Sequence, residues 1–325
     1  MLPSAIIIAA AMLSIAIIYK TGSSKETVLS KSKVALQEIV TGNDNGIENT
    51  GVAVSLEEET VAPSAGVELP IVWGDLGLEL IRAGAIDEIK WRSLYESRGM
   101  FSGEYERLLL GENDRRIKIT GDNAGYLLNL FWALGLAQSN PILIQGEMMD
   151  KRYGGPQNFA STGGWTIAKG NPMDHYSRHA FFTLTDEQQT LVEKVSENIY
   201  RPCCGNSTHF PDCNHGLAML GMLELMASQG VGEEEMYKAA LAVNSYWFPD
   251  QYATIARYLG QKGIDWQKVI PKTILGADFS SGQGFAKIAA QVTQPVERNG
   301  GGGCGVDDGQ PITVPVPRQE SGCGV

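Results

Sequence analysis

The sequence carries little charge, and it lacks the motifs that identify many enzymes and nucleic-acid-binding proteins. Only 19% of its 325 residues are charged, and the formal net charge is −11. Lys and Arg are scattered, so no basic stripe is present to neutralise phosphates, and nucleic acid is not expected as a partner. The G-x-S-x-G elbow, the P-loop and the protein-kinase motifs are absent. The lack of C-x-x-C disfavours a thioredoxin-like site, and the lack of C-x-x-C-H excludes covalent c-type haem.

Histidine and cysteine are rare, but most of them lie in one segment, residues 175–215. This segment holds all four histidines and three of the five cysteines, namely His175, His179, Cys203, Cys204, His209, Cys213 and His215. Thiolate and imidazole ligands together suit zinc, copper or iron better than calcium or magnesium. We therefore predict that a transition metal ion (zinc, copper or iron) is bound through part of the set Cys203, Cys204, His209, Cys213 and His215.

His175 and His179 extend this candidate site. They are four residues apart, so on a helix they would share a face and could hold one ion. The glutamate of H-E-x-x-H is missing between them, and the pair therefore gives no support for a metalloprotease. We expect both imidazoles near the metal. A structural site would have four protein ligands and a catalytic site would keep one position open, and the sequence allows either.

The surroundings of Cys213 also allow thiol chemistry. A helix is expected from about Leu217, with Asp212 or Asn214 as its cap, so Cys213 and His215 would lie at its N-terminus. There the helix dipole stabilises a thiolate, which favours metal binding and redox chemistry alike.

Two alternatives to a metal site therefore stay open. The first is a thiol-redox protein that uses Cys203, Cys204 and Cys213, with resolving thiols supplied by the two G-C-G-V copies at Cys304 and Cys323. The second is an interaction module without catalysis, in which a disulfide closes the loop before Cys213. An odd number of cysteines leaves at least one thiol free, metal-bound or paired with another molecule.

The ends of the chain differ in composition from its middle. Residues 4–19 are uncharged and mostly apolar, which predicts a membrane anchor or signal over residues 1–20. Residues 21–68 are polar and acidic and contain no aromatic residue, so a disordered linker is expected. The Gly-rich composition of residues 294–325 predicts a disordered tail. A single domain is thus expected over residues 69–293.

The orientation of the anchor is contested by the sequence. Four lysines come after the apolar run (Lys20, Lys25, Lys31 and Lys33), and by the positive-inside rule they would place the domain in the cytoplasm. A signal-like apolar segment at the N-terminus more often directs export of the domain attached to it. We expect an extracytoplasmic domain whose partner is the membrane, through this helix.

The central region has the pattern of an all-α domain. Apolar residues at helical spacing, bounded by capping residues, Gly and Pro, predict helices at about 76–83, 88–98, 123–136, 185–199, 217–226, 233–247, 250–259 and 285–292. No paired alternating strands or hairpin signals stand out. Residues 151–173 form a long Gly-rich stretch, which we interpret as a loop that covers the site.

Overall fold

The structure is a computed structural model that describes residues 56–101, 103–111 and 113–292. The predicted anchor at residues 1–20, the tail at 294–325 and most of the predicted linker lie outside the described residues. Within the described part, no helix is both long enough and apolar enough to cross a membrane. The described residues form a mainly α-helical fold with one two-stranded sheet, so the predicted helical character is confirmed.

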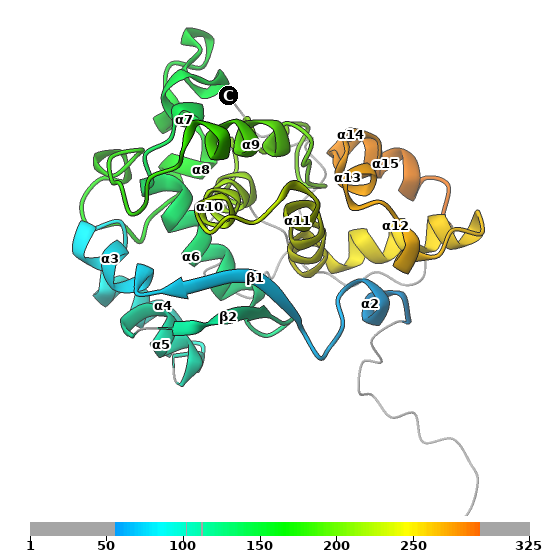
Figure 1. Ribbon diagram of the computed structural model, residues 1–325, viewed down its shortest axis with the longest axis horizontal. Coiled ribbons are helices and arrows are strands. Elements are labelled where there is room, and N and C mark those ends of the chain that lie inside the picture. Colours follow the sequence, from blue (N-terminus) through cyan, green and yellow to red (C-terminus); the bar gives the residue numbers. More distant parts are fainter. Residues whose placement is uncertain (1–55, 102, 112, 293–325) are drawn as a thin grey trace, which may run out of the picture. The chain divides into compact units, whose positions relative to one another are not determined.

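Two apolar helices lie at the centre of the described domain (Figure 1). Helix α6 (Ala124–Ala137) and helix α10 (Asn214–Ser228) are buried almost all round and pack against each other. Their backbones touch at a pair of glycines. A Cβ atom at Gly221 would lie 2.5 Å from the Gly135 backbone nitrogen, and one at Gly135 would overlap the carbonyl oxygen of Leu217. Only glycine at both positions permits this close crossing.

The predicted helices are present, with ends close to those expected. They are α3 (Leu76–Ala83), α4 (Glu88–Glu96), α6, α9 (Asp186–Ser196), α10, α11 (Glu233–Trp247), α12 (Pro249–Gln261) and α15 (Gly282–Ala289). Asp87 caps α4 through the amides of Ile89 and Lys90, and Thr185 and Gln188 form a reciprocal capping box on α9. Local capping chemistry therefore sets these helix starts.

Further short helices complete the fold. They are α2 (Leu56–Val61), α5 (Glu104–Leu110), α7 (Pro141–Gln145), α13 (Pro271–Leu275), α14 (Ala277–Ser280) and the 3₁₀ turn η5 (Trp266–Lys268). Helices α9 and α11 flank α10 (Figure 1), and α12 packs against α2 and α15.

The prediction that the domain contains helices alone missed a two-stranded antiparallel sheet. It consists of β1 (Val67–Gly74) and β2 (Asn113–Ile119), with Val67 opposite Ile119. The linker prediction for residues 21–68 is also corrected at its end, because α2 and the start of β1 lie inside that range. The side chains of Leu69, Ile71 and Trp73 alternate into the core, and this burial offsets the entropy of ordering the strand.

The outer edge of β1 is held by a side chain. The amide of Gln229, just after α10, accepts a hydrogen bond from the Val72 backbone nitrogen at 2.9 Å and donates to the Val72 carbonyl oxygen at 2.7 Å. A single primary amide thus satisfies both backbone groups that an adjacent strand would otherwise pair.

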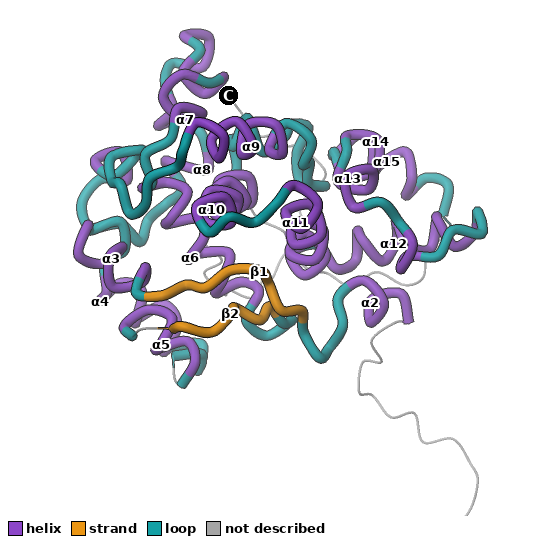
Figure 2. The backbone as a smooth tube through the Cα atoms, viewed as in Figure 1, coloured by secondary structure: helices purple, strands orange, loops and turns teal. Residues whose placement is uncertain are grey.

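The Gly-rich stretch at residues 151–173 is built from short turns (Figure 2). In chain order they are η2 (Lys151–Tyr153), η3 (Pro156–Asn158), α8 (Ala160–Gly163) and η4 (Pro172–Asp174), preceded by η1 (Glu147–Met149). Pro at the first helical position begins η3 and η4, and positive φ at Gly154 and Gly155 separates η2 from η3.

The glycine contact between α6 and α10 can be tested within one helix. We expect Gly135→Ala to lower the free energy of unfolding by about 1–3 kcal/mol or more, because the new methyl group overlaps the α10 backbone. Gly125→Ala is the matched control, since a Cβ there would meet no described atom within 4 Å beyond the adjacent residues and the backbone of its own helix. That variant should be unchanged or stabilised by up to about 1 kcal/mol. Equal denaturant midpoints for the two variants would contradict the close crossing.

Candidate metal centre

The segment between α9 and α10 is organised around a buried arginine. Arg201 is 1% exposed and is surrounded by the next residues of the chain, 202–213, called here the cysteine loop. Its Nε donates to Cys213 Sγ at 3.0 Å, and its Nη1 donates to the Asn206 carbonyl oxygen at 3.0 Å. Its Nη2 donates to Asp212 Oδ1 at 2.5 Å. One rigid guanidinium therefore fixes the middle and the end of the loop.

The first turn of α10 leaves space for this guanidinium at Gly216. A Cβ atom at Gly216 would lie 2.5 Å from Arg201 Nη2, so a glycine is needed where the arginine packs against the first turn. Asp212 does not cap the helix, although its position in the sequence had made it one of two expected caps. Its Oδ2 accepts from Asn206 Nδ2 at 2.9 Å while its Oδ1 pairs with the arginine. The residue at the N-cap is Cys213 itself.

Three thiols and one imidazole gather at this end of α10. Cys203 Sγ lies 3.8 Å from Cys213 Sγ, and neither they nor Cys204 form a disulfide with one another. Cys203, Cys213 and His215 each offer a ligand atom, and these three atoms lie within 4.8 Å of one another. A second group with the same property consists of Cys204, Asp212 and Cys213. Cys/His/Asp groups close enough to hold a metal ion are thus present, and Cys213 belongs to both.

The three thiols of the cluster differ in the direction in which their surroundings shift the pKa. Contacts with the Cys203 and Cys204 thiols, together with the Arg201 charge, hold the pKa of Cys213 well below its usual range, although burial opposes this. The pKa of Cys203 is raised by its contacts with Cys204 and Cys213 and by burial. The Cys203 thiol lowers the pKa of Cys204, but contact with Cys213 and burial outweigh it and raise that pKa to about 12. Cys213 is therefore the most acidic thiol of the cluster.

His215 is buried on the apolar side of the cluster. It is 6% exposed, its ring centre is 4.5 Å from that of Phe248, and Trp247 lies edge-on at 5.7 Å. Its Nδ1 is buried and has no hydrogen-bond partner among the described residues. A buried polar atom without a partner costs about 1–3 kcal/mol unless something else satisfies it.

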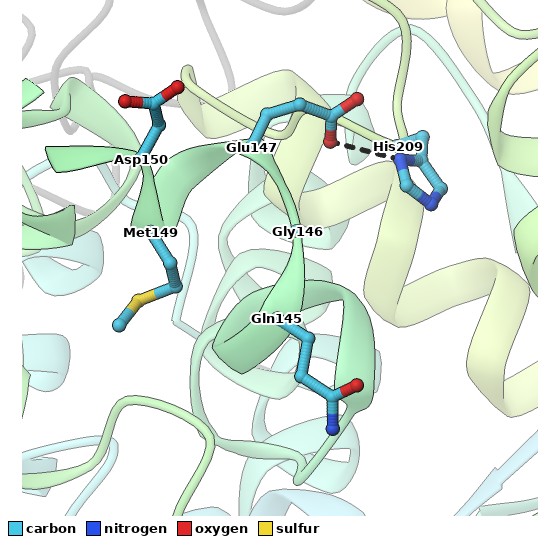
Figure 3. Close-up of a pocket in the computed structure, with 6 residues that line it drawn as sticks. All are labelled: Gln145, Gly146, Glu147, Met149, Asp150 and His209. Carbon is cyan, nitrogen blue, oxygen red and sulfur yellow. Dashed lines mark hydrogen bonds and ion pairs between the residues drawn. The ribbon is translucent and has the colours of Figure 1, made fainter. Parts of the chain in front are cut away.

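His209 also lies on the cysteine loop, but its side chain contacts Glu147 and not the cysteine cluster. Its Nδ1 lies 3.1 Å from Glu147 Oε2, at a shallow pocket lined by Gln145, Gly146, Glu147, Met149, Asp150 and His209. Figure 3 shows these two side chains directed at each other, while Gln145 and Met149 point away from the pair. His209 thus takes part in neither of the two ligand groups.

His175 and His179 form a separate pair, distinct from the cysteine cluster and from the His209–Glu147 pair. The expected helix is absent there, because residues 175–177 form a turn in which Ser177 has φ 52°. The imidazoles nevertheless meet, with His175 Nδ1 3.3 Å from His179 Nε2, and His175 Nε2 is 2.9 Å from the Lys169 carbonyl oxygen. Burial, and then the neighbouring ring, lower the pKa of His179. These two residues join neither ligand group.

The Gly-rich stretch does pack on the cysteine loop. Phe210 of that loop meets Tyr153 and Phe159 in a triangle of rings, with centres 5.3–5.5 Å apart. In addition, the Ser161 backbone nitrogen donates to the Asp212 carbonyl oxygen at 3.1 Å. The stretch therefore covers part of the loop with an aromatic contact and a backbone hydrogen bond.

The geometry places a buried Cys/His cluster at the N-terminus of the central helix of a mainly α-helical protein. The chain matches no protein-family model, no curated protein and no solved structure. Arg201 is not among the residues predicted from the sequence, and its one signal there is its position directly before Pro202 and the two cysteines. Asn206 and Glu147, the partner of His209, are not predicted either, because no spacing along the chain relates them to the cluster.

The same central helix carries an isolated buried acid. Glu224 is fully buried, and neither carboxylate oxygen has a hydrogen-bond partner among the described residues. Burial raises the pKa of Glu224 well above its ordinary value of 4.5, and the nearby amide of Asn140 offsets only part of this. Burial therefore favours the neutral acid form of Glu224 in the folded protein.

Removal of the arginine should collapse the loop. We expect Arg201→Met to lower the free energy of unfolding by about 3–5 kcal/mol, since it leaves Asp212 buried without its cation. Arg152→Met is the control, because the Arg152–Asp150 ion pair is exposed to solvent and should contribute nothing measurable. Denaturant unfolding of both variants tests this, and coincident curves would refute the role assigned to Arg201.

The buried acid predicts a pH dependence. Above pH 4.5 the folded protein binds more protons at Glu224 than the unfolded chain, so the free energy of unfolding falls with rising pH, by up to about 1.4 kcal/mol per pH unit. Glu224→Gln cannot ionise. It should be more stable than the parent at neutral pH, and the difference should vanish below pH 4.5. Stability profiles that run parallel over this range would contradict the burial of a neutral acid.

Proposed function

We propose that the protein binds one zinc ion through Cys203, Cys213 and His215. The observation that carries this proposal is the 3.8 Å separation of the Cys203 and Cys213 sulfur atoms, with a His215 nitrogen in the same group. Two sulfur ligands at about 2.3 Å from a tetrahedral zinc ion are separated by about 3.8 Å. The side chains would need little rearrangement to accept the ion.

Burial and charge favour a divalent ion. The Arg201–Asp212 ion pair cancels within the cluster, so a thiolate at Cys213 adds a negative charge that the buried site does not balance. Zn²⁺ with two thiolates and a neutral imidazole has no net charge, whereas Cu⁺ with the same ligands would keep one negative charge. An ion at this place would also account for the unpartnered nitrogen of His215.

The proposal uses fewer residues than the sequence predicts. His209 is paired with Glu147, and His175 and His179 are paired with each other. Cys204 Sγ lies 3.9 Å from both Asp212 Oδ1 and the Asn206 carbonyl oxygen, and both oxygens of Asp212 are already hydrogen-bonded. We therefore leave Cys204 outside the ligand set. With three protein ligands, the fourth position belongs to solvent or a small ligand.

The role of the ion would be to fasten the cysteine loop to the first turn of α10. Cys203 lies near the start of the loop, Cys213 ends it, and His215 lies in the helix. The loop also carries the contacts of His209 and Phe210 to the η1 and Gly-rich segments. Metal binding would thus stabilise the covering turns as well as the loop itself.

Elemental analysis of the chain, purified under reducing conditions without metal-affinity resin, tests the proposal. We expect about one zinc ion per chain in the parent protein, and a near-complete loss in Cys203→Ser and in His215→Ala, because each removes a ligand. Cys204→Ser is the matched control for Cys203→Ser, since the two residues are adjacent and equally small. It should retain the ion.

The other possible outcomes of the elemental analysis would change or refute the proposal. Loss of zinc in Cys204→Ser with retention in Cys203→Ser would assign the ion to the second group, Cys204, Asp212 and Cys213. Copper or iron at the same stoichiometry would keep the site and change its occupant. A folded, metal-free parent that stays metal-free after supplementation would refute the proposal, leaving the thiol-redox or disulfide alternatives.

A further inference from the structure

Cys203 and Cys213 differ from each other in access to solvent. Cys213 is 1% exposed and lies beneath the guanidinium of Arg201, whereas Cys203 is only partly buried. Cys203 is therefore the more accessible residue of the pair. A bound metal ion requires the Cys203 sulfur as the thiolate, which is the form that attacks a disulfide.

The geometry also selects one partner for Cys203. Its sulfur already lies 3.8 Å from Cys213 Sγ, and a disulfide would need the two atoms to approach to about 2 Å. The Cys204 thiol is placed against two oxygen atoms, Asp212 Oδ1 and the Asn206 carbonyl oxygen. Cys204 also contacts both members of the pair, but Cys203 Sγ and Cys213 Sγ lie 3.8 Å from each other without any other atom needed to bring them together.

We infer that Cys203 and Cys213 act as a redox switch that exchanges the metal ion for a disulfide. This inference rests on the proposed zinc site and names its regulation. The oxidant is a small-molecule disulfide. The Cys203 thiolate attacks one of its sulfur atoms, which forms a mixed disulfide and releases one thiolate. The Cys213 thiolate then attacks the Cys203 sulfur, which forms the Cys203–Cys213 bond and releases the second thiolate.

The electrons and charges balance in this exchange. Two electrons from the cysteine pair reduce the small disulfide to two thiolates, and Zn²⁺ leaves because it has lost both sulfur ligands. The buried cluster is neutral in both end states, as zinc with two thiolates or as a disulfide, while the Arg201–Asp212 pair is unchanged. The metal-free dithiolate between them would be a buried dianion, which burial disfavours strongly.

Either form closes the cysteine loop. The ion would link Cys203 to Cys213 through two coordination bonds, and the disulfide would link them directly. The contacts of Arg201 with Asn206 and Asp212 involve neither sulfur atom, so they persist in both states. Oxidation should therefore remove the ion without unfolding the domain.

The test uses the full chain with Cys304→Ser and Cys323→Ser, so that Cys203, Cys204 and Cys213 are its only thiols. Zinc content of the reduced protein is measured first. Glutathione disulfide is then added, released zinc is followed with a chromogenic chelator, and disulfides are mapped by mass spectrometry. We expect zinc to fall from about one ion per chain to near zero with formation of the Cys203–Cys213 linkage, and dithiothreitol to reverse both.

Two variants test which cysteine forms the disulfide with Cys213. In the same background, Cys204→Ser should keep the release of zinc and the linkage, whereas Cys203→Ser should form no intramolecular disulfide at Cys213. Circular dichroism of each oxidised sample checks that the helices remain. Zinc binding followed by a Cys204–Cys213 or Cys203–Cys204 linkage, or by no release, would overturn the switch and leave the zinc site standing. A reduced protein that takes up no zinc would end both proposals.

Discussion

The buried guanidinium of Arg201 is the constraint on which the rest of the site depends. Its donors reach the sulfur of Cys213, the carbonyl oxygen of Asn206 and the carboxylate of Asp212, so one side chain specifies the path of the cysteine loop. A buried cation needs matched anions. The loop supplies the Asp212 carboxylate as the counter-ion, and the same guanidinium holds the Cys213 sulfur within the candidate ligand group. The Arg201 contacts that fold the loop are therefore the same contacts that position the candidate ligands.

Most of the helices could be predicted because their information is local. The cap at Asp87, the box at Thr185 and Gln188, and the stop before Pro249 each act within a few residues. The sheet could not be predicted, since β1 and β2 are separated by α3, α4 and α5 and their pairing is non-local. Pro70, in the middle of β1, also obscured the alternation of Leu69, Ile71 and Trp73.

The candidate site was found only in part from the sequence, for a related reason. Crowding of cysteine and histidine identified the segment, and the position of Cys213 at a helix start was predicted and observed. Spacing along the chain could not show that His209 turns toward Glu147, because that contact joins residues far apart in sequence. Nor could it show that residues 175–177 adopt a turn, since a positive φ at a non-glycine residue such as Ser177 has no clear signal in the sequence.

The Gln229 side-chain amide attaches the C-terminal end of α10 to strand β1. The helix is fixed at its first turn by Arg201 against Gly216, and directly after its last residue by the two hydrogen bonds to Val72. Fifteen residues at about 1.5 Å each make it a strut of about 22 Å between the cysteine loop and the sheet. A displacement of the loop along that axis cannot be absorbed at the far end without loss of the bonds to Val72. The position of the cysteine loop and the outer edge of β1 are thereby coupled through α10.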